Sequence, residues 1–284
     1  GCRFGCGRAL TNFNWTAPLH PRLSINTISS ISQPLADDFP MLKRLGAHQF
    51  GFPMLKIEKD LEAGLVAIAG SGIAVTSVAA SSATSAMIEA DIALSIIKPA
   101  VDAAVRLGAP MAYITSGTTP PGMSTDVAFT RLAASLPKSR DYARAHNIKL
   151  AVENNSIANR SQGFTHTLTD TMWLANEADV GVTLELQNCW YERDLPRLFR
   201  QNIHRIAMVQ VSDFKVGEDT RMNRRVPGDG NIPLKWLFGE LLEAGYSGPL
   251  EVEIIGPAIS AEGAEPALRR TIDYLDAMLA ELGV

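Results

Sequence analysis

Acidic and amide side chains interrupt the apolar pattern at the ends of four successive apolar runs. The run at 180–184 leads directly into Glu185, and Gln187 and Asn188 follow it. A buried strand normally excludes such groups, because an unpaired charge taken out of water is costly. The same pattern recurs in three other runs, which end in Glu153, in Gln210, and in the pair Glu251 and Glu253. Polar groups at the ends of apolar runs predict either a functional site or a set of internal ion pairs.

Eight short apolar runs alternate with eight amphipathic segments along the chain. The runs predict strands at 23–28, 48–52, 73–78, 110–114, 149–153, 180–186, 206–211 and 249–255. The segments predict helices at 35–45, 56–69, 85–107, 126–146, 168–177, 194–204, 233–244 and 261–282. This alternation predicts an α/β protein, a single-domain (β/α)8 TIM barrel. A doubly wound sheet is disfavoured, because neither Gly-x-Gly-x-x-Gly after the first strand nor Gly-x-x-x-x-Gly-Lys-Ser/Thr occurs.

A barrel of this kind places its catalytic groups at the carboxyl ends of its strands. Glu153, Glu185, Gln210 and Glu253 are therefore predicted to converge at one mouth. Three carboxylates so close together repel one another unless a cation neutralises them or some of them hold protons. With the Gln210 carbonyl they form an all-oxygen shell, which suits Mn²⁺ or Mg²⁺ better than zinc. Glu251 lies deeper on the same strand face as Glu253 and is predicted to be an internal ion-pair or hydrogen-bond partner.

The composition limits the range of partners. The 284 residues carry 26 basic and 30 acidic side chains, a net charge of −4, and 46% of them are hydrophobic. This balance gives no electrostatic footprint for nucleic acid, and no apolar stretch is long enough to span a membrane. Three cysteines do not make a disulfide framework, so we expect a cytoplasmic protein. Residues 1–20 are predicted to be a loosely ordered N-terminal extension, and 21–284 the catalytic barrel.

Three segments resemble one family of TIM barrels. They are LAVENN at 150–155, RRVPGDGNIPL at 224–234 and GYSGPLEVEI at 245–254. On these segments the chain resembles the xylose isomerase-like TIM barrels, the sugar phosphate isomerase/epimerase family that contains ketose 3-epimerases and inosose dehydratases. In that family a Glu, an Asp, a His and a Glu, from strands five to eight, hold one divalent ion.

The resemblance implies that the corresponding residues of this chain hold the ion, namely Glu153, Glu185, Gln210 and Glu253. Two of them depart from the family, since Glu185 replaces the Asp and Gln210 replaces the His. Asn188 replaces a further family His, and the loss of both imidazoles implies a harder, more weakly binding site for Mn²⁺ or Mg²⁺. The family's His-x-x-Asp context survives as Gln210 and Asp213, so Asp213 is expected to support the ligands from behind.

The resemblance also implies a reaction. The ion would bind the ketone and an adjacent hydroxyl of a keto sugar or polyol, and would stabilise the enediolate formed when the neighbouring carbon loses a proton. Glu153 and Glu253 would act as the acid/base pair, which makes the protein an isomerase or epimerase. Substrate contacts are expected from Arg224, Asn188, Asn155 and Trp190.

Two alternatives stay open at this point. A lyase or dehydratase would use the same site if a β-substituent departs from a keto sugar, a keto-polyol or a 3-keto glycoside. A metal-free binding barrel would result if Glu185 and Gln210 mark a degraded site, although unpaired buried carboxylates such as Glu153 and Glu253 are costly to keep without use. The expected partner is a small carbohydrate-like molecule, without nucleic acid or membrane. A homo-oligomer is compatible with the resemblance, since relatives are often dimers or tetramers.

Overall fold

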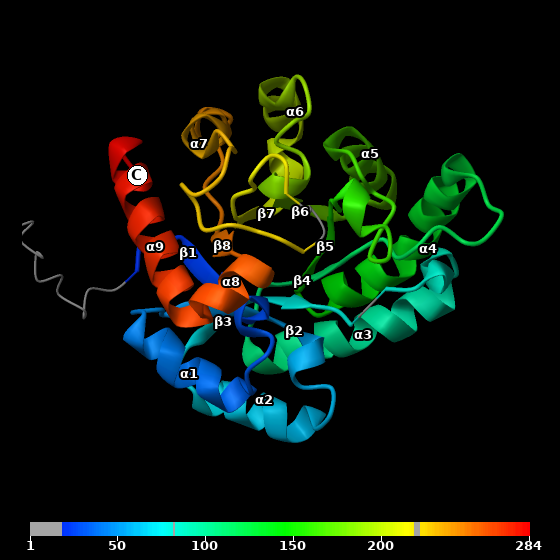
Figure 1. Cartoon of the computed structure of the whole chain (residues 1–284). Coiled ribbons are helices and arrows are strands. Elements are labelled where there is room, and N and C mark those ends of the chain that lie inside the picture. Colours follow the sequence, from blue (N-terminus) through cyan, green and yellow to red (C-terminus); the bar gives the residue numbers. More distant parts are fainter. Residues whose placement is uncertain (1–18, 82, 219–221) are drawn as a thin grey trace, which may run out of the picture.

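Eight parallel strands close into a barrel in the computed structural model of the chain, which describes residues 19–81, 83–218 and 222–284 (Figure 1). Each strand pairs with the next one in the sequence, and β8 closes the ring on β1. The strands are β1 Leu23–Asn26, β2 Gln49–Pro53, β3 Ala74–Ala79, β4 Met111–Ile114, β5 Lys149–Glu153, β6 Gly181–Glu185, β7 Ile206–Val211 and β8 Leu250–Val252. The predicted TIM barrel is therefore confirmed.

Helices connect the strands and surround the barrel (Figure 1). They are α1 Leu35–Arg44, α2 Leu61–Gly70, α3 Ala90–Leu107, α4 Thr125–Ala145, α5 Leu168–Ala178, α6 Leu195–Asn202, α7 Leu234–Glu243, α8 Pro257–Glu262 and α9 Ala264–Glu281. Short 3₁₀ helices follow several strands: Thr27–Ser30 after β1, Met54–Lys56 after β2, Ser85–Ile88 before α3, Ile157–Asn159 after β5 and Leu186–Asn188 after β6. One more, Ile203–Arg205, precedes β7.

Two predicted helices differ from the observed ones for local reasons. The second helix begins at Leu61 rather than at residue 56, because the Asp60 carboxylate accepts a hydrogen bond from the Ala63 backbone N–H at 3.0 Å and caps the first turn. The predicted helix 261–282 is two helices, because Gly263 lies between α8 and α9 with a φ of 99°. Such a φ is open to glycine and strained for other residues, so the chain turns there.

The strands are buried on both faces, as a parallel barrel covered by helices requires. All residues of β1, β4, β6 and β8 are buried. Most of these side chains are apolar, but the buried side chains near the carboxyl ends of the strands are polar or charged. They include Asn26, Glu153, Glu185, Gln210 and Glu253.

The N-terminal residues 1–18 lie outside the described part of the chain. Of the predicted extension, only Leu19 and His20 are described. Leu19 is buried, and its backbone N–H donates to the Gly46 carbonyl at 3.2 Å. Among the described residues, no helix combines the length and the apolar character needed to cross a membrane.

Candidate active site at the barrel mouth

The strands bring the four predicted ligand residues to one end of the barrel. Glu153 is the last residue of β5 and Glu185 the last of β6, while Glu253 directly follows β8. Gln210 is paired in register with Glu185 on one side and with Glu251 on the other. All of these side chains are buried. The side chains that the sequence predicts to converge therefore do so.

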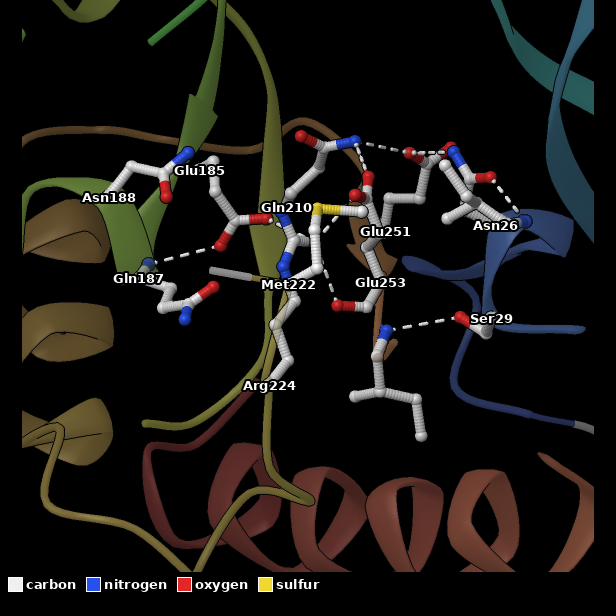
Figure 2. A network of polar contacts seen from close by, with 12 residues as sticks. Asn26, Ser29, Glu185, Gln187, Asn188, Gln210, Met222, Arg224, Glu251 and Glu253 are labelled. Carbon is white, nitrogen blue, oxygen red and sulfur yellow. Dashed lines mark hydrogen bonds and ion pairs between the residues drawn. The ribbon is translucent and has the colours of Figure 1, made fainter. Parts of the chain in front are cut away.

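Arg224 lies between two of these carboxylates. Its Nη1 atom is 2.9 Å from Glu185 Oε2 and 2.5 Å from Glu253 Oε1, and it donates to the Glu253 backbone carbonyl at 2.9 Å. Figure 2 shows the arginine side chain reaching between Glu185 and Glu253. The Arg224 residue is only 6% exposed. A protein cation therefore sits where the sequence predicts carboxylates around a metal ion.

Gln210 uses its amide nitrogen to join three neighbouring groups. Nε2 donates to Glu253 Oε2 at 2.5 Å, to Glu251 Oε2 at 3.0 Å and to the Tyr113 hydroxyl at 3.1 Å. The Gln210 Oε1 atom is buried and has no hydrogen-bond partner among the described residues. Gln210 thus links the two glutamates of the eighth strand and leaves one amide oxygen unsatisfied.

Glu251 is an internal hydrogen-bond partner, as the sequence predicts. Its carboxylate accepts hydrogen bonds from Asn26 Nδ2 at 2.9 Å and from Ser77 Oγ at 2.5 Å, in addition to the bond from Gln210. A Cβ atom at Gly51 would lie 2.0 Å from Glu251 Oε1, so only glycine leaves room for this carboxylate. Glu251 therefore supports the barrel interior beneath the mouth.

Burial changes the proton affinity of the glutamates. Burial, followed by the charge of Glu253, raises the pKa of Glu153 well above its ordinary value, although Arg224 opposes the rise. Burial also raises the pKa of Glu185 to about 7 against the opposing charge of Arg224. For Glu251, burial raises the pKa to about 7, and the hydrogen bonds from Asn26 and Ser77 limit the rise. One arginine thus does not compensate the cost of burying these carboxyl groups.

The donor set fits a hard divalent ion in its chemistry. Glu153, Glu185, Glu251 and Glu253 face one cation, Arg224, so the cluster carries an excess of formal negative charge. The Oε1 atom of Gln210 has no hydrogen-bond partner among the described residues, whereas Glu185 Oε2 is held by Arg224 alone. Oxygen is the ligand atom that Mn²⁺ and Mg²⁺ prefer.

The same side chains are not grouped as metal ligands while Arg224 lies between Glu185 and Glu253. Within 19–81, 83–218 and 222–284, no three His, Cys, Asp or Glu side chains are grouped closely enough to hold a metal ion. Arg224 contacts both Glu185 and Glu253, so an ion bound to these two residues requires the guanidinium to withdraw.

A cavity of about 250 Å³ opens at the mouth beside this cluster. Glu153, Asn155, Arg224 and Glu253 line it, together with apolar side chains from the loops after β1, β2 and β3. Two larger hollows, of about 340 and 370 Å³, lie at the opposite end of the barrel, away from the glutamates. The chemistry of the strand ends therefore identifies the smaller cavity as the candidate active site.

The other predicted substrate contacts divide into two groups. Asn155 lines the cavity, and its Oδ1 atom is buried without a hydrogen-bond partner among the described residues. Asn188 instead donates from Nδ2 to the Asn154 carbonyl at 2.7 Å. Trp190 is packed near Phe214, with ring centroids 6.4 Å apart. Neither Asn188 nor Trp190 is among the described residues that line the cavity.

Asp213 supports the loop that carries Arg224. Its carboxylate accepts hydrogen bonds from four backbone N–H groups, those of Phe214, Gly228, Gly230 and Ile232, at 2.8 to 3.1 Å. Its own backbone pairs with Arg225 in both directions, at 2.9 and 2.8 Å. Asp213 therefore holds the loop at 224–232 through the backbone, and its predicted support of the four ligand residues stays a prediction.

Three polar residues of the site escaped the sequence analysis. Asn154 binds the Glu185 backbone twice, accepting from its N–H at 2.8 Å and donating to its carbonyl at 3.0 Å. The Tyr113 hydroxyl accepts from Asn26 Nδ2 at 3.0 Å and from Gln210. Asn26 and Tyr113 lie at or near the ends of β1 and β4. A search for neutral polar groups at strand ends, in addition to charged ones, would have found them.

Comparison with known proteins finds similarity to one family of TIM barrels. Residues 40–278 match the sequence profile of a family described as the xylose isomerase-like TIM barrel. Among curated proteins the chain is similar to the L-ribulose-5-phosphate 3-epimerase UlaE of Escherichia coli O17:K52:H18 (strain UMN026 / ExPEC). The two are 28% identical over 161 residues, which cover 54% of this chain and 52% of that protein. The chain thus spans about half the length of the curated relatives it matches.

Two solved structures illustrate the structural likeness. The IolI protein with a bound zinc atom has a TM-score of 0.78 and 17% identity, and the match covers 92% of this chain and 99% of that one. The 3-keto-D-glucoside 4-epimerase YcjR from E. coli has a TM-score of 0.67 and 18% identity, and the match covers 87% and 97%. At these identities the likeness shows a shared fold.

Proposed function

Because the chain belongs to the family of xylose isomerase-like TIM barrels, we propose that it is an isomerase or epimerase of a keto sugar or polyol. The proposed reaction moves a proton at the carbon beside the carbonyl group. The similarity to a sugar-phosphate 3-epimerase over about half of its length supports a reaction of this kind. The arrangement of Glu153 and Glu253 is the structural observation that carries the proposal.

Glu153 and Glu253 face one cavity from different parts of the barrel wall. Glu153 ends β5 and Glu253 follows β8, with β6 and β7 between them. The Glu153 carboxylate forms no hydrogen bond or ion pair with any other described residue, so it is available to a substrate. Two carboxyl groups that approach one carbon from different sides suit the removal of a proton on one face and its return on the other.

The surroundings of the two groups suggest which one acts first as the base. Glu253 Oε1 contacts Arg224 and Oε2 accepts from Gln210, so two donors hold this carboxylate in place beside the cavity. The raised pKa of Glu153 favours a protonated group. In the proposed mechanism Glu253 takes the proton and Glu153 delivers one, while Arg224 and Asn155 bind substrate oxygens in the cavity.

We also propose that the four predicted ligands hold a divalent ion, Mn²⁺ or Mg²⁺, namely Glu153, Glu185, Gln210 and Glu253. The excess of buried carboxylates and the unsatisfied Oε1 atom of Gln210 support this proposal. Such an ion would act as a Lewis acid on the carbonyl group of the substrate. Arg224 has to leave its position between Glu185 and Glu253 when the ion binds.

Deuterium exchange tests the proposed reaction directly. The protein is incubated in D₂O with a panel of keto sugars, and NMR follows deuterium at the carbon beside the carbonyl together with any new epimer. We expect exchange with the wild-type protein and a loss of about 10²–10⁴-fold in Glu153→Gln and in Glu253→Gln. Glu177→Gln, a change at an exposed position on α5, is the matched control. Exchange that persists in both site variants would refute the assigned roles.

The same spectra separate the reaction classes. Release of a substituent from the neighbouring carbon would identify a lyase that uses the same acid/base pair. Metal analysis and a thermal-shift series with Mn²⁺, Mg²⁺, Co²⁺ and Zn²⁺ test the ion. We expect one ion per chain and a stabilisation that is lost in Glu185→Ala. A protein that binds no ion would exclude the metal proposal and leave the acid/base proposal to the exchange experiment.

A further inference from the structure

We infer that the substrate is an uncharged keto sugar that carries an apolar group, such as an alkyl or aryl glycoside. The inference rests on the proposed function, since it concerns the same cavity and adds the chemistry of the substrate. It follows from the division of the cavity wall into a polar and an apolar part, and from the state of the only cation that lines it among the described residues.

The charged and amide side chains of the wall come from the second half of the barrel. Glu153, Asn155, Arg224 and Glu253 lie there, and they offer hydrogen bonds of the kind that sugar hydroxyl and carbonyl oxygens make. Most of the apolar side chains come from the first half of the barrel, and Met222 and Ile255 add to them from the second half. Ile28 lies in the 3₁₀ helix after β1 and Ile31 just beyond it, while Pro53 and Leu55 come from the end of β2 and the next 3₁₀ helix.

The apolar side chains at the rim are open to solvent. Leu55 is 49% exposed, and Ile28 and Ile31 are each partly exposed. Exposed apolar side chains gathered beside a polar site are typical of a surface that a ligand covers. The cavity of about 250 Å³ is smaller than the roughly 300–1,000 Å³ of sites for drug-sized ligands. A sugar ring inside the cavity therefore leaves its substituent at the rim, against Leu55 and Ile31.

The charges of the cavity disfavour a phosphorylated substrate. Arg224 is the only basic residue among the described residues of the lining. Its guanidinium already contacts two carboxylates, Glu185 and Glu253, and the Glu253 carbonyl. Among the described residues of the lining, a phosphate group placed here would meet two glutamates and no cation without a carboxylate partner. Like charges at short range repel. The similar epimerase from E. coli is named for a 5-phosphate, so this chain is expected to differ from it.

Rates of deuterium exchange with matched substrates test the inference. The probes are methyl and phenyl 3-keto-D-glucoside, and L-ribulose with and without its 5-phosphate. We expect kcat/KM for the phenyl glycoside to exceed that for the methyl glycoside by about tenfold or more. The 5-phosphate should be no better than the free ketose. Equal rates for the two glycosides, or a preference for the phosphate, would overturn the inference without touching the proposed function.

Binding measurements test the preference for an apolar group even if none of these compounds undergoes deuterium exchange. Calorimetry with phenyl and methyl β-D-glucoside, which cannot react, measures the preference for an apolar group by binding alone. Equal affinities for the two glucosides would overturn the inference. Leu55→Ser should reduce the phenyl-to-methyl ratio by about threefold or more, as expected for the loss of several methylene groups from an apolar contact. Leu61→Ser is the matched control, because Leu61 is 42% exposed and lies outside the described lining. A ratio that is unchanged in Leu55→Ser contradicts the assignment of the rim.

Discussion

Strand β6 has a carboxylate beside arginine at each of its two ends. At the amino end, Asp179 has a side chain that is 46% exposed, and it contacts Arg205 at 2.7 Å and Arg144 at 3.1 Å. Hydrogen bonds from these two arginines lower the pKa of Asp179 to about 2. At the carboxyl end, Glu185 is fully buried and lies 2.9 Å from Arg224, yet its pKa is raised to about 7 because of burial.

The difference shows that access to water, rather than the choice of partner, decides whether the pKa of the paired carboxylate is lowered or raised. An exposed carboxylate keeps its hydration, so an arginine neighbour adds a small favourable term. A buried pair loses the hydration of both groups, and the desolvation cost can exceed the attraction between them. The pair at Asp179 therefore helps to hold the fold, while the cluster at Glu185 costs stability. The proposed site explains why such a cluster is kept.

Removal of the buried cation should have the largest effect on stability. We expect Arg224→Met to lower the free energy of unfolding by about 3–5 kcal/mol, because it leaves two carboxylates buried without their partner. Chemical denaturation at neutral pH without divalent ions measures the loss. Arg225→Met is the control, since Arg225 is partly exposed and pairs with Glu218. A change no larger in Arg224→Met than in the control would contradict the comparison.

The variant Arg224→Met also tests the proposal that the site binds a metal ion. With the guanidinium removed, Mn²⁺ no longer competes with Arg224 for Glu185 and Glu253. We therefore expect Mn²⁺ to raise the melting temperature of Arg224→Met more than that of the wild-type protein, since a ligand that binds only the native state stabilises it. A smaller shift in the variant would mean that the arginine does not occupy the place of the ion.

Removal of both charged partners should have an intermediate effect. We expect Glu185→Met combined with Arg224→Met to recover about 1–3 kcal/mol of the loss seen in Arg224→Met, because the double change replaces a buried ion pair by apolar side chains. A double-mutant cycle from denaturation curves measures this coupling. Additive effects of the two changes would show that Glu185 and Arg224 do not interact energetically.

The exposed end of β6 should give the smallest effect. We expect Asp179→Asn to cost no more than about 1 kcal/mol at pH 7, in the range of surface ion pairs. The pKa of Asp179 lies below its ordinary value of 3.8, so its contribution is present above about pH 4 and disappears as the pH falls towards 2. Unfolding curves of wild type and variant should therefore converge at low pH. A gap that widens on acidification would contradict this sign.

The sequence predicted the architecture because the fold depends on a repeated local signal. Alternating apolar runs and amphipathic segments marked all eight strands. The second helix begins later than predicted because Asp60 caps its first turn. The convergence of Glu153, Glu185, Gln210 and Glu253 was predictable for a related reason, since parallel strands deliver their carboxyl ends to one mouth.

The position of Arg224 was not predictable from the sequence. It depends on the loop at 224–232, which is fixed by three hydrogen bonds to the Asp213 carboxylate from residues 15 to 19 positions away. Spacing along the chain carries no information about such a long-range contact. The placement of Asn188 follows from local structure instead. The 3₁₀ helix Leu186–Asn188 turns the chain directly after Glu185 and brings the Asn188 amide to the Asn154 carbonyl.

The close approach of β2 to the glutamate beneath the mouth also limits how this chain can evolve. A Cβ atom at position 51 would lie 2.0 Å from Glu251 Oε1 and 2.3 Å from Ser77 Oγ. An alanine at 51 is therefore accessible only after residue 251 has become shorter or has moved. The Ser77 hydroxyl blocks the same Cβ atom, so changes or movements at both 77 and 251 have to precede an alanine at 51.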